Sequence, residues 1–593
     1  MQVYKAPLED MRFVLFELLD AGQLAALPGF EEATPDTIGT VLEEGAKLCE
    51  GELLPLNRIG DETGCTYENG VVHTPPGFKE AYKSFVEGGW LAVSADPAFG
   101  GQGLPDLINF VFDEMVCAAN LSFGNYPLLS KGATAAILAH GTDELKARYV
   151  PKLIEGRWSG TMCLTEPQCG TDLGLIRTKA LPTGDGSYRI TGTKIFITAG
   201  EHDLSENIIH LVLAKLPDAP AGTRGISLFL VPKFLPREDG EAGPRNGVAC
   251  AGIEKKMGIH ASATCVINFD EAEGWLIGEP HQGLRCMFTM MNAARLGVGL
   301  QGLGIGEAAY QSAVAYARER RQGRSLKGPA EPEAAADPII VHPDVRRMLL
   351  TQRALNEGAR ALGYQVALEL DIARKHPDAG RREEADDFVQ LMTPIVKAFF
   401  TDCGFLAANL AVQIHGGHGY IREHGIEQYV RDARIPQLYE GTNGIQALDL
   451  VGRKLGLHNG RLLRRFFHPV TAFLEENKDD ERMAEFVAPL AKGVERLRNA
   501  TLTLAGRGLA DPEEAGAAAS EYLRLFALVA VGYMWARMAK LALAQNGGGN
   551  GFHAAKLKTA RFYMARLMPE TGALFAQLMA GKRSLMEMGA DEF

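Results

Sequence analysis

The chain has 593 residues, which is too long for one hydrophobic core and predicts several packed domains. Its 46% hydrophobic and 23% charged residues are typical of an ordinary globular protein and exclude a disordered chain. Its formal net charge of -12 disfavours a surface built to neutralise phosphates, so we expect no nucleic acid partner.

The first 158 residues read as mostly helical, and the glycine-rich loop DPAFGGQGLP interrupts them. A second pattern follows from 159 to 282, where short segments rich in Ile, Val, Thr and Phe are bounded by Gly, Pro or Asp. These segments predict a β domain with a polar hairpin-like insert at REDGEAGPRNG. Its predicted strands lie in YRITGTKIFITAG, NIIHLVLAKL, ISLFLVPKF and ATCVINFD.

Helical spacing returns at residues 283–458 and continues in an Ala- and Leu-rich block at 459–593. We expect a Pro-rich loop at SLKGPAEPEAAADP, a charged connector at RKHPDAGRREEADD, and loops at GRGLADPEEAG and QNGGGNG. The apolar run LFALVAVGYMW is too short to span a bilayer and predicts a buried helix rather than a membrane-docking face. The domain order is therefore α, β, α and an added α domain.

Cysteine usage and the N-terminal sequence bear on the compartment. The nine cysteines are scattered without a CxxC pair, which fits a reduced cytoplasm better than a secreted disulfide scaffold. The N-terminus lacks a basic start followed by a long apolar run, so no signal peptide is evident. We expect a cytoplasmic protein without stable membrane insertion.

Two stretches of the β domain could contact a ligand. In CLTEPQCGTDLG, Thr165, Thr171 and the amides beside Gly170 could surround a flat polar ligand or a phosphate, although a plain capped loop explains the stretch as well. In TKIFITAG, strict alternation places Lys194, Phe196 and Thr198 on one face, where a ring and a hydroxyl could hold a ring system. Ordinary β propensity accounts for the same residues.

The helical regions carry two further candidates. The segment AARLGVGLQGLGIGEAAYQSAVAYARERRQGR begins with small residues that allow close helix packing, and its C-terminal arginines could hold a pyrophosphate. A solvated face is the competing interpretation, and it is strongest for Arg318 and Arg321. In QIHGGHGY no Cys, Asp or Glu joins the two histidines at ligand spacing, so we expect no metal site.

Read in order, these and neighbouring motifs resemble the acyl-CoA dehydrogenase family over approximately residues 40–455. The resemblance implies an α+β multidomain fold. It has an N-terminal helical domain at 1–158, a middle β-barrel-like domain at 159–282 and a C-terminal four-helix bundle at 283–458, with FAD between the last two. The added α domain at 459–593 resembles a longer subgroup of the family. The motifs that carry the resemblance are PAFGGQGLP, CLTEPQCGTD, KIFITAG, KMGIHASATCVINFD, LIGEPHQGL, YARERRQGR, VQIHGGHGY and RDARIPQLYEGTNGIQ.

The resemblance also implies FAD contacts from several segments. Some residues would face the flavin, its phosphates and the CoA arm: Leu164, Thr165, Gly170, Thr171, Phe196 and Thr198. Others would reach the ADP half of FAD across a subunit interface: Arg320, Gln322, Gln413, Gly416 and Gly417. Such an interface requires at least a dimer, so we expect a homodimer or a homotetramer. Thr442 and Asn443 would also touch FAD, while Gly444 lacks the side chain that some relatives use there.

Glu440 in YEGTNG matches the family's catalytic base. It would take the α proton of an acyl-CoA while the β hydrogen leaves as hydride to FAD, giving a trans-2-enoyl-CoA, with electrons passed on to electron-transfer flavoprotein. Some relatives carry their base beside Arg295, but that neighbour here is Ala294. The predicted substrate-binding residues are Thr171, Asn292, Arg295 and Gly441, and Asn292 stands where relatives often have Asp.

Within the longer subgroup, the resemblance favours 3-methylthiopropionyl-CoA (3-methylmercaptopropionyl-CoA) of dimethylsulfoniopropionate breakdown as the substrate. A broad-range fatty acyl-CoA dehydrogenase of β-oxidation is the alternative. An acyl-CoA oxidase would differ in passing electrons to oxygen. A DNA-binding relative would need a basic extension and an impaired site, whereas Glu440 is present and DDERMAEF and DPEEAG carry mixed charge.

Overall fold

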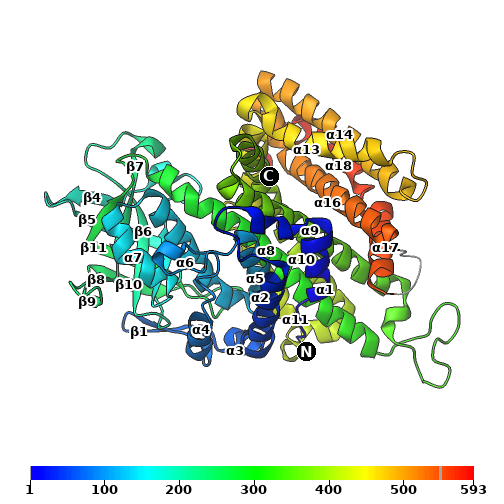
Figure 1. The fold of residues 1–593 in the computed structure, drawn as a ribbon, viewed down its shortest axis with the longest axis horizontal. Coiled ribbons are helices and arrows are strands. Elements are labelled where there is room, and N and C mark those ends of the chain that lie inside the picture. Colours follow the sequence, from blue (N-terminus) through cyan, green and yellow to red (C-terminus); the bar gives the residue numbers. More distant parts are fainter. Residues whose placement is uncertain (1, 546–550) are drawn as a thin grey trace. The chain divides into compact units, whose positions relative to one another are not determined.

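The computed structural model describes residues 2–545 and 551–593 and forms two compact units (Figure 1). One unit comprises Glu44–Gly297, and the other combines Met1–Glu43 with Val298–Phe593. The predicted loop QNGGGNG falls largely on residues 546–550, outside the described residues. The helices and strands below keep the labels of Figure 1.

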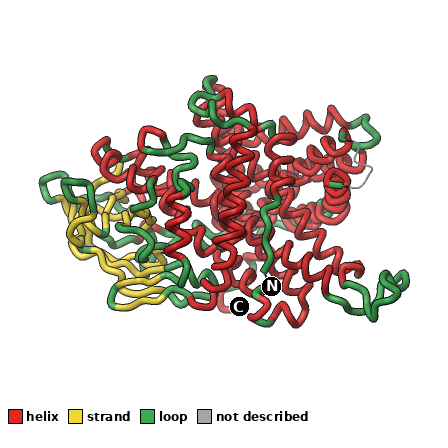
Figure 2. Tube along the Cα trace, turned by 60° about the horizontal axis from the view of Figure 1, so that its bottom comes forward, coloured by secondary structure: helices red, strands yellow, loops and turns green. Residues whose placement is uncertain are grey.

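The strands of the described residues, drawn yellow in Figure 2, all belong to the unit Glu44–Gly297. β1 and β2 form a small hairpin, β8 and β9 form another, of which β9 lies within the predicted polar insert, and the remaining seven make one sheet. The strands are β1 (Thr66–Glu68), β2 (Val71–His73), β3 (Trp158–Cys163), β4 (Lys179–Pro182), β5 (Tyr188–Thr198), β6 (Asn207–Lys215), β7 (Ile226–Pro232), β8 (Phe234–Pro236), β9 (Ala242–Arg245), β10 (Val248–Ile253) and β11 (Thr264–Ile277).

The seven-stranded sheet closes on itself, as expected for a barrel-like domain. Its main path runs β10-β11-β5-β4-β6-β3, and β7 pairs with both β11 and β6, so that β11, β5, β4, β6 and β7 make a ring. β3 pairs with β6 in parallel and β7 pairs antiparallel with both its neighbours. A closed ring leaves few free strand edges. Its interior is filled by buried apolar side chains, among them Ile190, Val212, Phe229, Val231 and Cys265.

Helices make up the rest of this unit. Several of them are rich in buried apolar residues, and α6 contains Gly132. Gly160 of β3 approaches α6 so closely that a Cβ added to Gly160 would lie 2.4 Å from the Cβ of Ala133. The first turns of the long helix α8 (Gly283–Glu319) also belong here, up to Gly297. The other helices are α3 (Leu54–Thr63), α4 (Phe78–Glu87), α5 (Asp106–Ala119), α6 (Leu121–His140) and α7 (Asp143–Ile154).

The second unit is helical. Within it, the later turns of α8 pack against α10 (Ala379–His415) through glycines, as the run of small residues predicts. A Cβ at Gly302 would lie 2.3 Å from the Phe400 carbonyl oxygen, and one at Gly404 would lie 2.2 Å from that of Gly302. α9 (Pro343–Lys375) and α11 (Ile426–Arg434) pack on α10 as well. The short helix α12 (Asn443–Asp449) follows the predicted catalytic loop.

Two predicted loops of this unit are wrong. The charged connector at RKHPDAGRREEADD is only His376–Asp378 long, because α10 begins at Ala379 and Asp378 caps it by accepting from the Arg381 N–H at 2.7 Å. Arg and Glu are good helix formers, so a charged pattern is compatible with a solvated helix face. In GRGLADPEEAG, the helix continues to Ala510 and breaks only at Asp511.

The added helices continue the same unit. Two helices of the described residues, α10 with its extension to Tyr420 and α16, are long and apolar enough to cross a membrane, but 67% and 78% of their most apolar windows are buried inside the protein. The run LFALVAVGYMW lies in α16 and is buried, as predicted for a core helix. The added helices are α13 (Arg461–Asn477), α14 (Ala484–Ala510), α15 (Pro512–Ala517), α16 (Ala519–Ala544), α17 (Phe552–Phe562), α18 (Glu570–Met579) and α19 (Arg583–Met586).

A buried charge cluster joins the added helices to the rest of the unit. Lys556 of α17 is fully buried, and its ammonium pairs with Asp10 of α1 (Leu8–Arg12) and with Glu357 of α9 at 2.7 Å. Arg360, one turn further along α9, pairs with Asp10 at 2.6 Å and with Glu307 of α8 at 3.0 Å. Buried charges are tolerated only when they are paired in this way.

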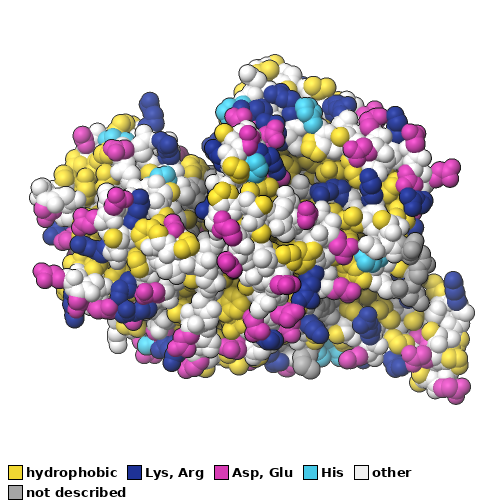
Figure 3. All heavy atoms as spheres, viewed as in Figure 1, with side chains coloured by type: hydrophobic (Ala, Val, Ile, Leu, Met, Phe, Trp, Pro, Cys, Tyr) yellow, Lys and Arg dark blue, Asp and Glu magenta, His cyan; other side chains and the backbone are white. Residues whose placement is uncertain are grey.

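The outer surface is mixed. On the face drawn in Figure 3, acidic and basic side chains are intermingled over most of the surface. Such a distribution is ordinary for a globular protein with a modest net negative charge.

We predict that Lys556→Ala destabilises the protein by about 3 kcal/mol, because Asp10 and Glu357 lose the buried cation that they share and keep Arg360 and Arg353, respectively. Thermal and urea unfolding of the purified chain measure the effect. Lys558→Ala is the matched control, since Lys558 lies two residues away and is exposed. Equal unfolding midpoints for the two variants would contradict a stabilising role for the cluster.

Candidate active site

The hexapeptide Tyr439–Gly444 forms a loop with an unusual backbone. Glu440 has φ of 59° and Gly441 has φ of 85°. The left-handed region is easy for glycine but rare for a residue with a side chain, and surrounding structure must hold it there. Glu440 is half-buried, and its Oε2 oxygen is buried.

A buried lysine from the middle of α10 holds this loop. Lys397 is fully buried, and its Nζ donates to the Gly441 carbonyl oxygen at 2.8 Å and to Asn443 Oδ1 at 2.9 Å. Gln446 of α12, also fully buried, donates from Nε2 to the Glu440 carbonyl oxygen at 3.0 Å. The conformation of Glu440 is therefore fixed by donors on both sides of the loop.

The two residues after Gly441 also stabilise the loop. Thr442 Oγ1 caps α12 by accepting from the Ile445 N–H at 3.3 Å. The Asn443 amide donates to Thr401 Oγ1 at 3.0 Å and to Asp402 Oδ1 at 2.7 Å, both on α10. Their predicted contact with FAD stays a prediction. What the structure adds is that both side chains shape the loop that carries Glu440.

The sequence did not point to Lys397 or Gln446. The signal for Lys397 was available, since a lysine inside the apolar helical run MTPIVKAFF must find buried acceptors. Gln446 gave no comparable signal, because glutamine is common on exposed helix faces.

The residues predicted to reach the ADP half of FAD gather at the far end of α10. Tyr316 of α8 stacks on His415 with ring centroids 4.2 Å apart, and its hydroxyl lies 3.0 Å from His418 Nδ1. This contact brings the end of α8 next to the end of α10. Five predicted residues lie there, and all are exposed: Arg320, Gln322, Gln413, Gly416 and Gly417.

These five residues do not lie beside Glu440 within one chain. Gln413 is sixteen positions beyond Lys397 on α10, a distance of about 24 Å along the helix axis at 1.5 Å per residue. Two further arginines after α8 contact residues of the following loop. Arg321 pairs with Glu331 at 2.6 Å, and Arg324 donates to the Glu331 carbonyl oxygen at 3.0 Å. That result supports the solvated-face interpretation for Arg321 and removes Arg324 as a free cation.

In the sheet unit, a buried ion pair fixes the predicted flavin loop. Lys194 is fully buried and donates to the Leu164 carbonyl oxygen at 2.9 Å and to Glu166 Oε1 at 2.8 Å. Although burial acts to raise it, Lys194 and the hydrogen bonds from Thr178 lower the pKa of Glu166 to about 2. The Ile195 N–H donates to the Thr165 carbonyl oxygen at 2.9 Å. Leu164 and Thr165 are thus tied to β5 through their backbone, and Gly170 and Thr171 follow in the exposed part of the loop.

A β-bulge explains the placement of Phe196. Between the pairs Ile197–Cys265 and Lys194–Ile267, β5 has one more residue than β11, and Phe196 takes φ of 58°. The expected strict alternation is therefore wrong here, because Lys194 points into the interior whereas Phe196 is 58% exposed. Bulges re-aim side chains in this way, often next to active sites. Thr198, two residues on, is half-buried and pairs with Thr264.

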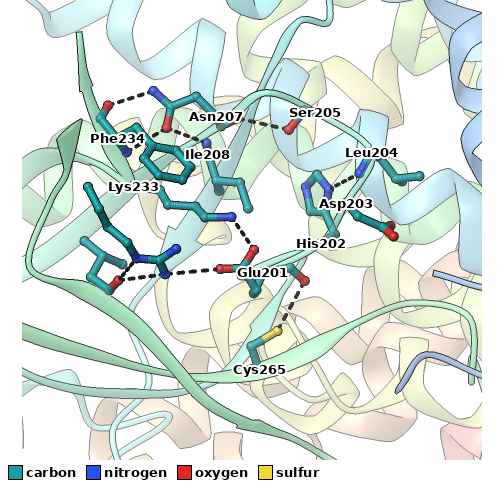
Figure 4. Close-up of polar contacts among 12 residues, drawn as sticks. Glu201, His202, Asp203, Leu204, Ser205, Asn207, Ile208, Lys233, Phe234 and Cys265 are labelled. Carbon is teal, nitrogen blue, oxygen red and sulfur yellow. Dashed lines mark hydrogen bonds and ion pairs between the residues drawn. The ribbon is translucent and has the colours of Figure 1, made fainter. Parts of the chain in front are cut away.

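A polar cluster holds the turn directly after Thr198 (Figure 4). Glu201 is buried and pairs with Lys233, the residue directly after β7. The Leu204 N–H donates to His202 Nδ1 at 3.2 Å. His202 Nε2 therefore carries the hydrogen and donates to Ser159 Oγ at 2.9 Å. Burial, together with Lys233, lowers the pKa of His202 to about 3, so the ring is neutral. Sequence reasoning gave no role to this cluster, which ties the turn after β5 to Ser159 of β3 and to Lys233, directly after β7.

The two predicted substrate residues of α8 differ in exposure. Asn292 is exposed, whereas Arg295 is buried and its guanidinium lies 5.8 Å from the centroid of the Phe288 ring. Ala294, at the alternative base position, is also buried. Throughout the described part of the chain, no group of three or more His, Cys, Asp or Glu side chains is arranged to hold a metal ion.

Four family models match successive parts of the chain. They are described as acyl-CoA dehydrogenase N-terminal domain (residues 47–157), middle domain (161–272) and C-terminal domain (281–455), and acetyl-CoA dehydrogenase C-terminal like (466–589). The last match covers the added helices. The resemblance predicted from the motifs and the fold class that it implies are confirmed.

The chain is also similar to curated proteins along its whole length. It is 45% identical to the 3-methylmercaptopropionyl-CoA dehydrogenase of Ruegeria pomeroyi, over 98% of this chain and 99% of that one. It is 34% identical to a butyryl-CoA dehydrogenase of Syntrophomonas wolfei, over 100% and 99% of the two chains. A broad-specificity linear acyl-CoA dehydrogenase of Mycobacterium tuberculosis is also 34% identical, over 96% of each chain.

Two solved structures share the complete fold. An acyl-CoA dehydrogenase of Bacillus anthracis complexed with FAD has a TM-score of 0.75 at 20% identity, over 100% of this chain and 94% of that one. A Caenorhabditis elegans protein solved in complex with a CoA ligand has a TM-score of 0.76 at 17% identity, over 95% and 91%. At these identities the likeness concerns the fold, including the added helices.

We predict that Lys397→Met loosens the loop that carries Glu440. Methionine is close to lysine in size but donates no hydrogen bond, so the Gly441 carbonyl and the Asn443 side chain lose a charged donor. Hydrogen exchange of the amides in residues 439–446 should accelerate by about tenfold or more, since 1.4 kcal/mol corresponds to a factor of ten. Lys492→Met on the exposed side of α14 is the control, and unchanged exchange in Lys397→Met would show that the clamp is dispensable.

Proposed function

Because the chain belongs to the acyl-CoA dehydrogenase family, we propose that it is an FAD-dependent dehydrogenase of 3-methylmercaptopropionyl-CoA. The product would be methylthioacryloyl-CoA, the trans-2-enoyl thioester. The observation that carries this choice of substrate is the 45% identity to the Ruegeria pomeroyi enzyme over nearly all of both chains. The butyryl-CoA and broad-specificity relatives cover the chain equally well but are only 34% identical.

The residues of the sheet unit fit a flavin. The bulge and the left-handed backbone of Phe196 leave its aromatic side chain 58% exposed. An exposed phenyl ring in such a fixed position is suited to stack against the flat flavin ring. We propose that Leu164, Thr165, Gly170, Thr171, Phe196 and Thr198 bind the flavin half of FAD. FAD, when bound, supplies the acceptor for a hydride.

The chemistry needs a base and a carbonyl-binding donor at fixed positions. We propose that the Glu440 carboxylate accepts the proton from the α carbon. FAD, held by the residues named above, would supply the acceptor for the β hydride, so that the Cα–Cβ double bond can form. The α C–H is a very weak acid, so the developing enolate oxygen must be stabilised. The backbone N–H of Glu440 is suited to this task, because Lys397 and Gln446 fix the loop before substrate binds.

We further propose that Thr171, Asn292, Arg295 and Gly441 bind the thioester and its CoA arm, and that Thr442 and Asn443 bind FAD through the loop they shape. Arg320, Gln322, Gln413, Gly416 and Gly417 would bind the ADP half of FAD in a second subunit. Their exposure and their distance of about 24 Å along α10 from the Glu440 loop support this division. The protein would then be at least a homodimer.

Electron-transfer flavoprotein is the proposed acceptor of electrons from the reduced enzyme, and the cytoplasm the proposed location. The division into domains at 1–158, 159–282, 283–458 and 459–593 is also part of this proposal. Its first three parts correspond to the known order of helical, sheet and helical segments in the chain.

We predict that Glu440→Gln folds and binds FAD but loses turnover by roughly 100- to 10,000-fold, because the amide cannot accept the α proton. Anaerobic mixing with substrate, followed by loss of the oxidised flavin absorbance, measures the step directly. Glu495→Gln on α14 is the control, because Glu495 is an exposed glutamate. Normal flavin reduction in Glu440→Gln would refute its assignment as the base.

The substrate is tested by comparing one enzyme preparation on several thioesters. We expect kcat/KM to be highest for 3-methylmercaptopropionyl-CoA and at least about tenfold lower for butyryl-CoA and octanoyl-CoA, since one poorly filled subsite costs about 1–3 kcal/mol. A flat profile, or a maximum at octanoyl-CoA, would favour the broad-range fatty acyl-CoA reading instead.

A further inference from the structure

Four helices of the helical unit enclose a pocket that the proposed reaction does not use. It lies between α9 and α10 of the bundle and α13 and α16 of the added helices, and its volume is about 360 Å³. This size falls within the range of about 300–1,000 Å³ that is common for small-molecule sites. None of the residues proposed above for FAD or substrate lines it.

One part of the pocket wall is apolar. Leu362 of α9, Phe388 of α10, Phe466 of α13, and Ala530 and Met534 of α16 contribute to it. These five side chains come from four helices, so the apolar part of the wall is not a stripe on one helix. Such a surface favours a hydrocarbon group.

The carboxylates of the pocket are already neutralised. Glu369 accepts two hydrogen bonds from Arg381 Nη2, at 2.9 and 2.7 Å, and Glu384 pairs with Arg465 at 2.9 Å. Arg465 also lies 3.2 Å from Asp387. These ion pairs satisfy one another and leave no negative group to attract a cation.

Of the remaining polar groups, Gln365 accepts from Arg537 Nη1 at 2.8 Å, and the others can donate hydrogen bonds. Arg464 makes one weak hydrogen bond, from Nη1 to the Asn459 carbonyl oxygen at 3.3 Å, and it has no carboxylate within ion-pair distance among the described residues. His468 is exposed on the same helix, and Tyr533 of α16 also lines the pocket. The guanidinium of Arg537 lies 5.5 Å from the Tyr533 ring and adds positive charge beside it.

We propose that this pocket binds a small monocarboxylic acid with a hydrocarbon tail. The carboxylate would be held by Arg464, whose planar fork matches two carboxylate oxygens, with His468 and the Tyr533 hydroxyl nearby. The tail would lie against Phe388, Phe466 and Met534. The site is separate from the reaction site and does not depend on which thioester the enzyme dehydrogenates.

Occupancy of the pocket has a structural consequence. A ligand that contacts α9, α10, α13 and α16 together stabilises the packing of the added helices on the bundle, since binding to the folded state shifts the folding equilibrium. The ligand would therefore stabilise the helical unit. Since α10 also carries Lys397, this stabilisation would include the helix that holds the Glu440 loop.

Octanoate is the probe for the test, and the full FAD-loaded protein is used in the presence of excess acyl-CoA, so that the reaction site is filled. Isothermal titration should show octanoate binding that Arg464→Gln weakens by about tenfold or more, as expected for the loss of one charge-assisted hydrogen bond. Octanol, which has the same tail without the charge, should bind at least about tenfold more weakly. Tyr533→Phe should weaken octanoate binding by a smaller factor.

Arg566→Gln is the matched control, because Arg566 is an exposed arginine of the added helices that does not line the pocket. It should bind octanoate as the wild type does. The proposal is overturned if acyl-CoA abolishes octanoate binding, if Arg464→Gln and Arg566→Gln bind octanoate equally, or if octanol binds as tightly as octanoate. A failed substrate assignment would leave all three binding comparisons unchanged.

Discussion

The hydrogen bonds from the buried Lys397 ammonium to the Gly441 carbonyl and to Asn443 are the interaction on which the proposed active site depends. Burying an ammonium costs several kcal/mol unless nearby acceptors replace its water. The acceptors here lie in the loop that carries Glu440. The loop therefore supplies the hydrogen bonds that the buried lysine requires, and the lysine in turn fixes the conformation of the loop. The left-handed backbone of Glu440 persists because donors act on both flanks. The proposed role of Glu440 as a base would gain from such fixation, because small misplacements are costly for catalysis.

The sheet unit uses the same principle at Phe196. A non-glycine residue again adopts a left-handed backbone, and a buried lysine next to it, Lys194, again donates to a loop carbonyl. Here Glu166 balances the charge of the lysine, whereas Lys397 donates to a carbonyl oxygen and to a side-chain amide oxygen. Strained backbone is concentrated at functional sites because only a rigid surrounding structure can maintain it. Two of the residues implicated by the family resemblance, Glu440 and Phe196, are among the ten non-glycine residues with positive φ in the described part of the chain.

The four segments predicted as strands correspond to β5, β6, β7 and β11, because β-branched and aromatic residues are concentrated there between turn signals, and the long helices follow from their 3.6-residue spacing. The shorter strands β1 to β4 and β10 were not among the predicted segments. The sequence could not predict the inward turn of Lys194, because a bulge arises from the pairing of β5 with β11 and not from β5 alone. The predicted connector at 374–387 is wrong for a related reason. Solvated helices and loops share a polar composition, and here the Asp378 cap marks the start of a helix. Family motifs located Glu440, but its supports Lys397 and Gln446 became evident only once α10 and α12 were placed beside the loop.

The added helices are part of the same structural unit as the loop that carries Glu440. Lys556 of α17 pairs with Glu357 on α9, and the Trp535 indole of α16 donates to the Ala354 carbonyl oxygen at 2.9 Å. α16 also packs on α10 and on α12, the helix that begins directly after the Glu440 loop. An appendage for membrane docking would keep its apolar face exposed, whereas α16 turns its apolar residues into these contacts. The added helices therefore buttress the helices that hold Lys397 and Gln446, and through them the position of Glu440.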